Sequence, residues 1–154
     1  MKLYITYGTE ADQVIALRLQ ALAAVNGLSA YVPPVYTRRA HAINLEPESH
    51  AKLLDSDVVL GVVTTSISDT LRRELEAARE LLKQAMLIAD PSSASVLQDY
   101  FPGRVAVIDQ ANPAAAEEEI VKLLKRAEIG QTAKRALIAL GTLALGLMLF
   151  AAHE

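Results

Sequence analysis

Residues 58–63 read VVLGVV, a run without a polar side chain that lies between Asp57 and Thr64. A strand that is covered by helices on both faces is apolar at nearly every position, whereas a half-buried strand alternates apolar and polar residues. The run is therefore typical of the centre of a parallel sheet. We expect an α/β domain in which residues 57–64 form the central strand.

Strand-like and helix-like patterns alternate along the rest of the chain. The further strands are expected at residues 3–7, 28–32, 85–89 and 104–108, and helices at residues 9–26, 46–54, 66–82, 92–100 and 113–127. This alternation predicts right-handed crossovers and helices on both faces of the sheet. The predicted fold is a doubly wound, five-stranded parallel sheet of order 2-1-3-4-5, spanning residues 1–127.

The last segment of the chain differs in composition. Residues 136–152 read ALIALGTLALGLMLFAA and carry no charge, and about 20 such residues are needed to span a bilayer. Basic residues gather before this run and none follows it except His153, so the positive-inside tendency places the α/β domain in the cytoplasm. We expect a linker at residues 128–133 and a single-pass transmembrane helix at residues 134–154. A buried or oligomerising helix is the alternative.

Charge and cysteine content narrow the possible ligands. The formal net charge is −3, and basic and acidic residues are interspersed, so the phosphate backbone of a nucleic acid is not an expected partner. The chain holds no cysteine, which excludes disulfides, thiolate nucleophiles and thiolate metal sites. His41 and His50 lack the spacing of a metal-ligand pair. We therefore predict no metal site and no resident cofactor.

The predicted winding order indicates where a ligand would bind. In open parallel sheets, ligands bind beyond the carboxyl ends of the strands at the point where the winding reverses, here between the first and third strands. The residues expected there are Thr6, Tyr7, Gly8, Thr9, Thr64, Thr65, Ser66 and Ser68. The helix that follows adds Glu74, which could stabilise an oxocarbenium-like centre or act as nucleophile or base in glycosidic chemistry. A solvated surface position is the alternative for this residue.

Two other features bear on the ligand. Gly8 stands alone between Tyr7 and Thr9, so the first turn lacks the glycine-rich loop of a Walker or Rossmann phosphate site. The proline-bounded loop at residues 33–45 carries Tyr36, Arg38 and Arg39. Loops at this end of such sheets often carry function, and these three side chains could meet an anionic or aromatic ligand or a partner.

Three stretches resemble the Toll/interleukin-1 receptor (TIR) domains of bacteria. They are the opening LYITYGTEAD, the YVPP segment with its long loop, and SDVVLGVVTTSISDTLRRELEAARELLKQAMLIAD. The resemblance spans about residues 1–127, and its motifs are recognised by their order and spacing. It places Glu74 on the glutamate with which catalytic members cleave the nicotinamide glycosidic bond of NAD. Thr70 and Leu71 stand where many members have a Trp-Cys pair.

The resemblance implies a membrane-anchored effector that hydrolyses NAD on self-association, with a role in bacterial defence or signalling. NAD would be a substrate, and the strand-end residues would hold its ribose and phosphates. Two alternatives remain open. One is a non-enzymatic TIR-like scaffold that assembles through the loop at residues 33–45. The other is an enzyme similar to nucleoside deoxyribosyltransferases, for which Asp69 or Asp90 could supply a second carboxylate.

Overall fold

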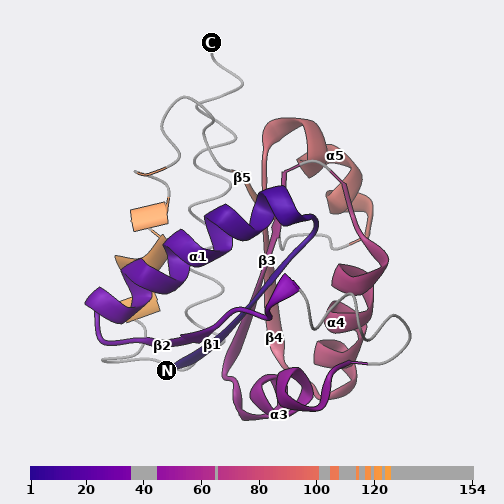
Figure 1. Cartoon of the computed structure of the whole chain (residues 1–154). Helices are drawn as coiled ribbons and strands as arrows, with labels where there is room; N and C mark the ends of the chain where they lie inside the picture. Colours follow the sequence, from indigo (N-terminus) through magenta and orange to yellow (C-terminus); the bar gives the residue numbers. More distant parts are fainter. Residues whose placement is uncertain are drawn as a thin grey trace.

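A computed structural model describes residues 1–35, 45–64, 66–100 and 105–107, together with residues 114, 117, 118, 120–122, 124 and 125 of a last helical segment. The elements are β1 (Lys2–Tyr7), α1 (Glu10–Val25), β2 (Ser29–Tyr31), α3 (Pro47–Asp55), β3 (Val58–Val63), α4 (Asp69–Glu80), β4 (Gln84–Ala89), α5 (Pro91–Tyr100) and β5 (Val105–Val107). Figure 1 shows their arrangement around the sheet.

The strands form one sheet in the order β2-β1-β3-β4-β5, and every neighbouring pair is parallel. The predicted α/β class and the order 2-1-3-4 of the first four strands are confirmed. β3 lies at the centre, with β1 paired on one side from Leu3↔Val58 to Tyr7↔Val62 and β4 on the other. All six residues of β3 are buried, as expected for a strand that helices cover on both faces.

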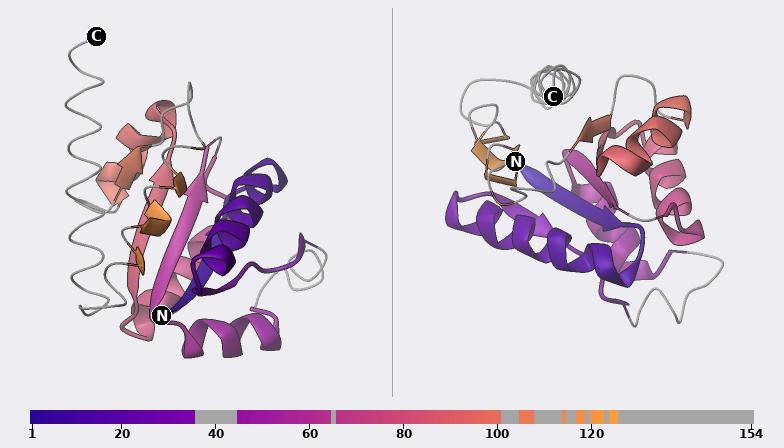
Figure 2. Two further views of the ribbon diagram at one scale, coloured as in Figure 1. Left: turned by 90° about the vertical axis from the view of Figure 1, so that its left-hand side faces the viewer. Right: turned by 90° about the horizontal axis from the view of Figure 1, so that it is seen from above.

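Helices cover both faces of the sheet (Figure 2), and a separate core of buried side chains lies on each face. On one face, alternate residues of β1, β3 and β4 pack against α1 and against the last helical segment. On the other face, the intervening residues pack against α3, α4 and α5. Because successive side chains of a strand point to opposite faces, each central strand contributes to both cores. Residues 36–44 and 126–154 lie outside the described residues.

Charged side chains join neighbouring elements at the edges of the domain. The Arg18 guanidinium of α1 binds the Glu117 carboxylate in the last helical segment, with Nη2 2.8 Å from Oε1. Lys83 donates from Nζ to the carbonyl oxygens of Leu54 and Ser56, each at 2.6 Å, and so satisfies groups near the end of α3. These contacts join elements that are distant in the sequence.

No helix in the described part of the chain is long and apolar enough to cross a membrane. The predicted linker (128–133) and transmembrane helix (134–154) lie outside the described residues. Both stay predictions.

Gly61 lies in the centre of β3, where its lack of a side chain lets Leu87 and Leu71 pack closely against the strand. A Cβ atom at this position would lie 2.6 Å from Leu87 Cδ2 and 3.6 Å from Leu71 Cδ1. Both leucine side chains are fully buried, so neither can move without disturbing the core.

We predict that Gly61→Ala lowers the free energy of unfolding by about 1–3 kcal/mol, because the added methyl group overpacks this core. Urea denaturation of the full chain measures the change. The double variant Gly61→Ala/Leu87→Ala is the control, since truncation of Leu87 removes the clash. The two substitutions should be less than additive, and strict additivity would show that the clash is not the cause.

Candidate functional site

The point where the winding reverses is held together by the carboxylate of Asp12, in the first turn of α1. This side chain is fully buried. Its Oδ2 accepts from the Thr9 backbone N–H at 3.2 Å, and its Oδ1 accepts from the Thr64 backbone N–H at 3.1 Å and from the Thr64 hydroxyl. The carboxylate therefore joins the start of α1 to the end of β3.

Gly8 brings the β1–α1 turn against the loop that follows β3. Its N–H donates to the Val62 carbonyl oxygen at 2.8 Å. A Cβ atom at Gly8 would lie 2.5 Å from the Ser66 carbonyl oxygen and 2.9 Å from Asp12 Oδ2. Only glycine fits this approach without a backbone shift.

The residues predicted to bind a ligand at this edge take different positions. Thr6 and Tyr7 are buried, and the Tyr7 hydroxyl donates to the Pro33 carbonyl oxygen at 2.5 Å. Ser66 is exposed. The Ser68 hydroxyl accepts from the Leu71 N–H at 3.2 Å and so caps α4. Thr65, Tyr36, Arg38 and Arg39 lie outside the described residues.

Glu74 lies in the middle of α4 and is only 1 % exposed. It shares the buried face of the helix with Leu71, Leu75 and Ala78, which pack on the sheet. The solvated surface position considered as an alternative is therefore wrong. A buried carboxylate is costly unless its surroundings compensate it, so its place on this face requires polar neighbours.

Tyr31 of β2 and Ser49 of α3 are joined by a hydrogen bond, and Glu74 of α4 acts electrostatically on Tyr31; we name these three residues the polar cluster. The Tyr31 hydroxyl and Ser49 Oγ are 3.1 Å apart, and the Tyr31 ring lies 5.6 Å from the Tyr4 ring. Burial raises the pKa of the Tyr31 phenol, the hydrogen bond with Ser49 lowers it in part, and carboxylates that include Glu74 raise it further. Tyr31 thus lies within electrostatic range of the Glu74 side chain.

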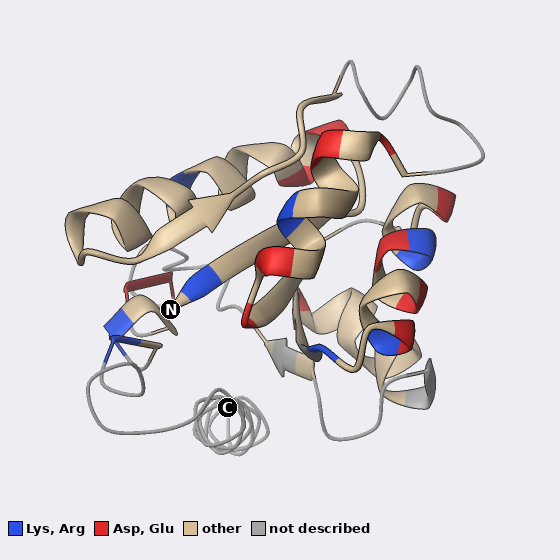
Figure 3. Cartoon of the chain, turned by 90° about the horizontal axis from the view of Figure 1, so that it is seen from below, with Lys and Arg blue, Asp and Glu red and all other residues tan. Residues whose placement is uncertain are grey.

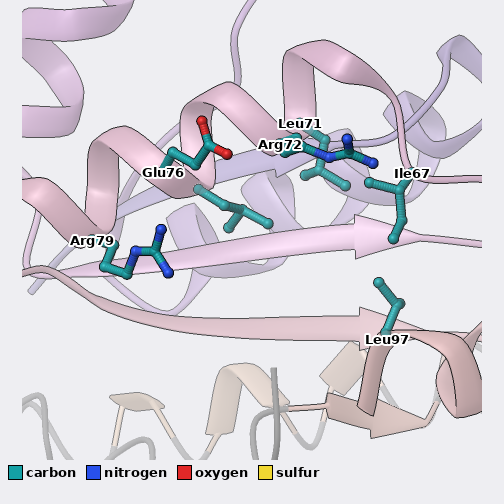
Figure 4. Close-up of a pocket in the computed structure, with 7 residues that line it drawn as sticks. Ile67, Leu71, Arg72, Glu76, Arg79 and Leu97 are labelled. Atoms are coloured by element: carbon teal, nitrogen blue, oxygen red, sulfur yellow. The ribbon is translucent and has the colours of Figure 1, made fainter. Parts of the chain in front are cut away.

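A groove of about 230 Å³ lies along another side of α4, between that helix and α5 (Figure 4). Its lining residues are Ile67, Leu71, Arg72, Leu75, Glu76, Arg79 and Leu97. At about 100° per residue, Glu74 lies about 60° to one side of Leu71 around the helix axis, whereas Arg72, Glu76 and Arg79 lie about 80–140° to the other. The groove and the polar cluster therefore occupy opposite edges of the buried face of α4.

Asp90 follows β4 at the same end of the sheet. Its carboxylate accepts from the Ser92 hydroxyl at 2.5 Å and from the Ser93 N–H at 3.1 Å at the start of α5. Burial alone would raise the pKa of Asp90, but these hydrogen bonds outweigh it and hold the pKa below its usual value. The Asp90 carboxylate is thus hydrogen-bonded at the start of α5. Asp69 is exposed at the start of α4.

Sequence reasoning did not find all of the residues that shape this region. Asp12 was not among the residues predicted for this region, although its carboxylate joins α1 to the end of β3. Tyr31 and Ser49 gave no local signal, because their meeting with Glu74 depends on the packing of three separate elements. Within the described residues, no group of three or more His, Asp or Glu could hold a metal ion.

Comparisons with known proteins bear on the fold. No family model and no curated protein matches the chain. Among solved structures, the chain is similar to a cysteine-to-serine mutant of flavodoxin from Pseudomonas aeruginosa, with 18% sequence identity and a TM-score of 0.50 over 84% of this chain and 100% of that one. The fold is flavodoxin-like. At this level of identity, the likeness shows the fold alone.

We predict that Asp12→Asn lowers the free energy of unfolding by about 1–3 kcal/mol, because an amide cannot accept all three hydrogen bonds and its NH₂ group would face donors. Chemical denaturation of the full chain measures the loss. Asp69→Asn, an exposed substitution in the first turn of α4, is the matched control and should cost a few tenths of a kcal/mol. Equal losses in the two variants would contradict the structural role of Asp12.

The lowered pKa of Asp90 predicts a dependence of stability on pH. In the unfolded chain, a carboxyl of this kind titrates at about pH 3.9. The contribution of Asp90 to folding stability is therefore complete above that pH, and it is lost as the pH falls through the lower pKa of the folded state. Thermal denaturation between about pH 5 and pH 2 should show a shallower loss for Asp90→Asn than for the wild type. The loss of stability in Ser92→Ala should be intermediate between the losses in Asp90→Asn and in the wild type. Identical slopes for Asp90→Asn and the wild type would refute this assignment.

Proposed function

We propose that the chain is a TIR-like effector domain that self-associates and then hydrolyses the nicotinamide glycosidic bond of NAD, with Glu74 as the reactive carboxylate. The supporting observation is the place of Glu74, which is buried on the helix after the central strand and within electrostatic range of Tyr31. A fully buried glutamate is uncommon in proteins, so its place on this face calls for a structural or a chemical role. The fold and the resemblance agree with this choice.

The proposed reaction requires little of the protein beyond one negative charge. The bond between the ribose anomeric carbon and the pyridinium nitrogen breaks, and its electron pair leaves with neutral nicotinamide. Glu74 stabilises the positive charge that develops on the ribose. Water then adds to the anomeric carbon and releases a proton, so the products are ADP-ribose, nicotinamide and H⁺. Neither a metal nor a resident cofactor is needed in this scheme.

The burial of Glu74 explains why activity in this proposal depends on self-association. A carboxylate that is 1 % exposed cannot reach a substrate until the packing around it opens. Assembly that favours the open arrangement would therefore activate the enzyme by a population shift. We propose that residues 136–152 anchor the chain in a membrane with the domain in the cytoplasm, which raises its local concentration and promotes assembly. A role in bacterial defence or signalling belongs to this proposal.

The groove along α4 favours a second function, that of a non-enzymatic scaffold. It lies away from Glu74 and combines an apolar floor with charged side chains at its border, as an interaction site does. Thr70 and Leu71 in place of the Trp-Cys pair also fit a scaffold. The deoxyribosyltransferase-like alternative gains no support, because Asp90 is engaged at the start of α5.

We predict that Glu74→Gln lowers NAD turnover by at least about a hundredfold, because the neutral amide cannot stabilise the charged ribose. Nicotinamide release by the concentrated or membrane-reconstituted full chain measures the rate. Glu80→Gln is the matched control, since Glu80 lies on the same helix, is exposed and does not line the groove.

The control variant should keep wild-type turnover. Equal unfolding midpoints must first show that both variants fold, because Glu74 is buried. Turnover that survives in Glu74→Gln would exclude this carboxylate as the catalytic group. No turnover in any assembled form of the protein would favour the scaffold.

A further inference from the structure

The outer face of α1 is apolar, although it lies on the surface. Val14 is 57% exposed, Leu17 46% and Val25 85%, and Ala21 between them is exposed as well. At about 100° per residue, these four side chains fall within an arc of about 80°. We name them the α1 stripe. The buried residues of the same helix, such as Ala16, Leu19 and Ala23, lie on the opposite side.

The helix is poor in charge along this stripe. Figure 3 shows α1 as largely uncharged, whereas α4 alternates acidic and basic positions. The cation beside the stripe, Arg18, is bound to Glu117. A surface helix normally presents polar residues to solvent. An apolar outer face therefore indicates that another apolar surface packs against it.

The spacing of the α1 stripe suits another helix. Val14, Leu17 and Ala21 are separated by three and then four residues, which is the spacing that lets one helix pack along a second. In an antiparallel pair related by a two-fold axis near residues 19 and 20, Val14 would meet Val25 of the other copy and Leu17 would meet Ala21. Apolar side chains thus face apolar ones, with Leu17 against the smaller Ala21, and the surface complements itself.

The charges at the two ends of α1 fit the same arrangement. Glu10 begins the helix and is exposed. Beyond its other end, Lys125 Nζ lies 3.3 Å from the position that a Cβ atom would take at Gly27. An antiparallel pair brings the acidic start of each helix to the basic end of the other and also opposes the two helix dipoles.

From this complementarity we infer that α1 pairs with α1 of a second copy of this chain, in antiparallel orientation about a two-fold axis. The inference rests on the self-association in the proposed function and names its surface. One helix pair is a small interface beside the roughly 1,200–2,000 Å² of stable complexes. The dimer therefore forms where the chains are concentrated, as on a membrane.

Single cysteines test both the contact and its orientation, because the natural chain has none. In the antiparallel pair, the Cα atoms of the two Ala21 residues are offset by about 4.5 Å along the axis, and those of the two Val25 residues by about 16 Å. A disulfide spans Cα atoms about 4.4–6.8 Å apart. Oxidation of full-length Ala21→Cys should give covalent dimers, and Val25→Cys should give at least about tenfold fewer.

A charge in the stripe tests whether the apolar contact drives the pairing. Adding Leu17→Glu to the Ala21→Cys variant should lower the yield of covalent dimer at least about tenfold, because the carboxylate would be buried against apolar groups. Val96→Glu, at an equally exposed apolar position on α5, is the matched control and should leave the yield unchanged. Equal unfolding midpoints show that the variants fold.

Three results would overturn the inference. Ala21→Cys could stay monomeric, as expected if lipid or another segment covers the stripe. Ala21→Cys and Val25→Cys could cross-link equally, as a parallel pair or random collision predicts. Leu17→Glu could leave the yield unchanged. Glu74→Gln separates this inference from the proposed catalysis, because that variant should lose NAD turnover and keep the Ala21→Cys cross-link.

Discussion

The buried carboxylate of Asp12 fixes the edge of the sheet on which the candidate site depends. By accepting from Thr9 at the start of α1 and from Thr64 at the end of β3, it joins the two loops between which the winding reverses. Gly8 allows these loops to touch, because no side chain fits between its Cα atom and the Ser66 carbonyl oxygen. The start of α4, and with it the position of Glu74, follows from the course of the loop that Asp12 holds. The interaction is therefore structural, and it helps to place Glu74.

The proposed mechanism separates the reactive group from the accessible surface. Glu74 lies at one edge of the buried face of α4, within electrostatic range of Tyr31, while the groove with Arg72 and Arg79 lies at the other edge, toward α5. A single chain thus keeps its carboxylate closed, which would prevent wasteful hydrolysis of NAD. Pairing through α1 acts on the opposite face of the sheet, so it can concentrate and orient the domains without covering α4.

Much of the architecture could be predicted because local sequence patterns specify it. The VVLGVV run identified the central strand, since only a strand covered on both faces is apolar throughout. The strand–helix alternation then gave the order 2-1-3-4. The site was harder to predict, because burial depends on tertiary packing. Nothing near Glu74 in the sequence indicates Tyr31 or Ser49 as neighbours, and Ser68 resembled a ligand-binding residue but caps α4. The apolar outer face of α1 was also not predicted. Because this helix carries apolar residues on both sides, the sequence does not indicate which side faces solvent.

The central claim is that a carboxylate closed in the single chain becomes reactive in the assembled one. The most direct test is nicotinamide release per chain from NAD, measured while the surface density of the full-length protein on lipid vesicles is raised at constant total protein. The account predicts that the rate per chain rises steeply with density and then levels off as assembly is completed. A rate per chain that stays constant across all densities would show that the single chain is already competent, and would contradict the claim.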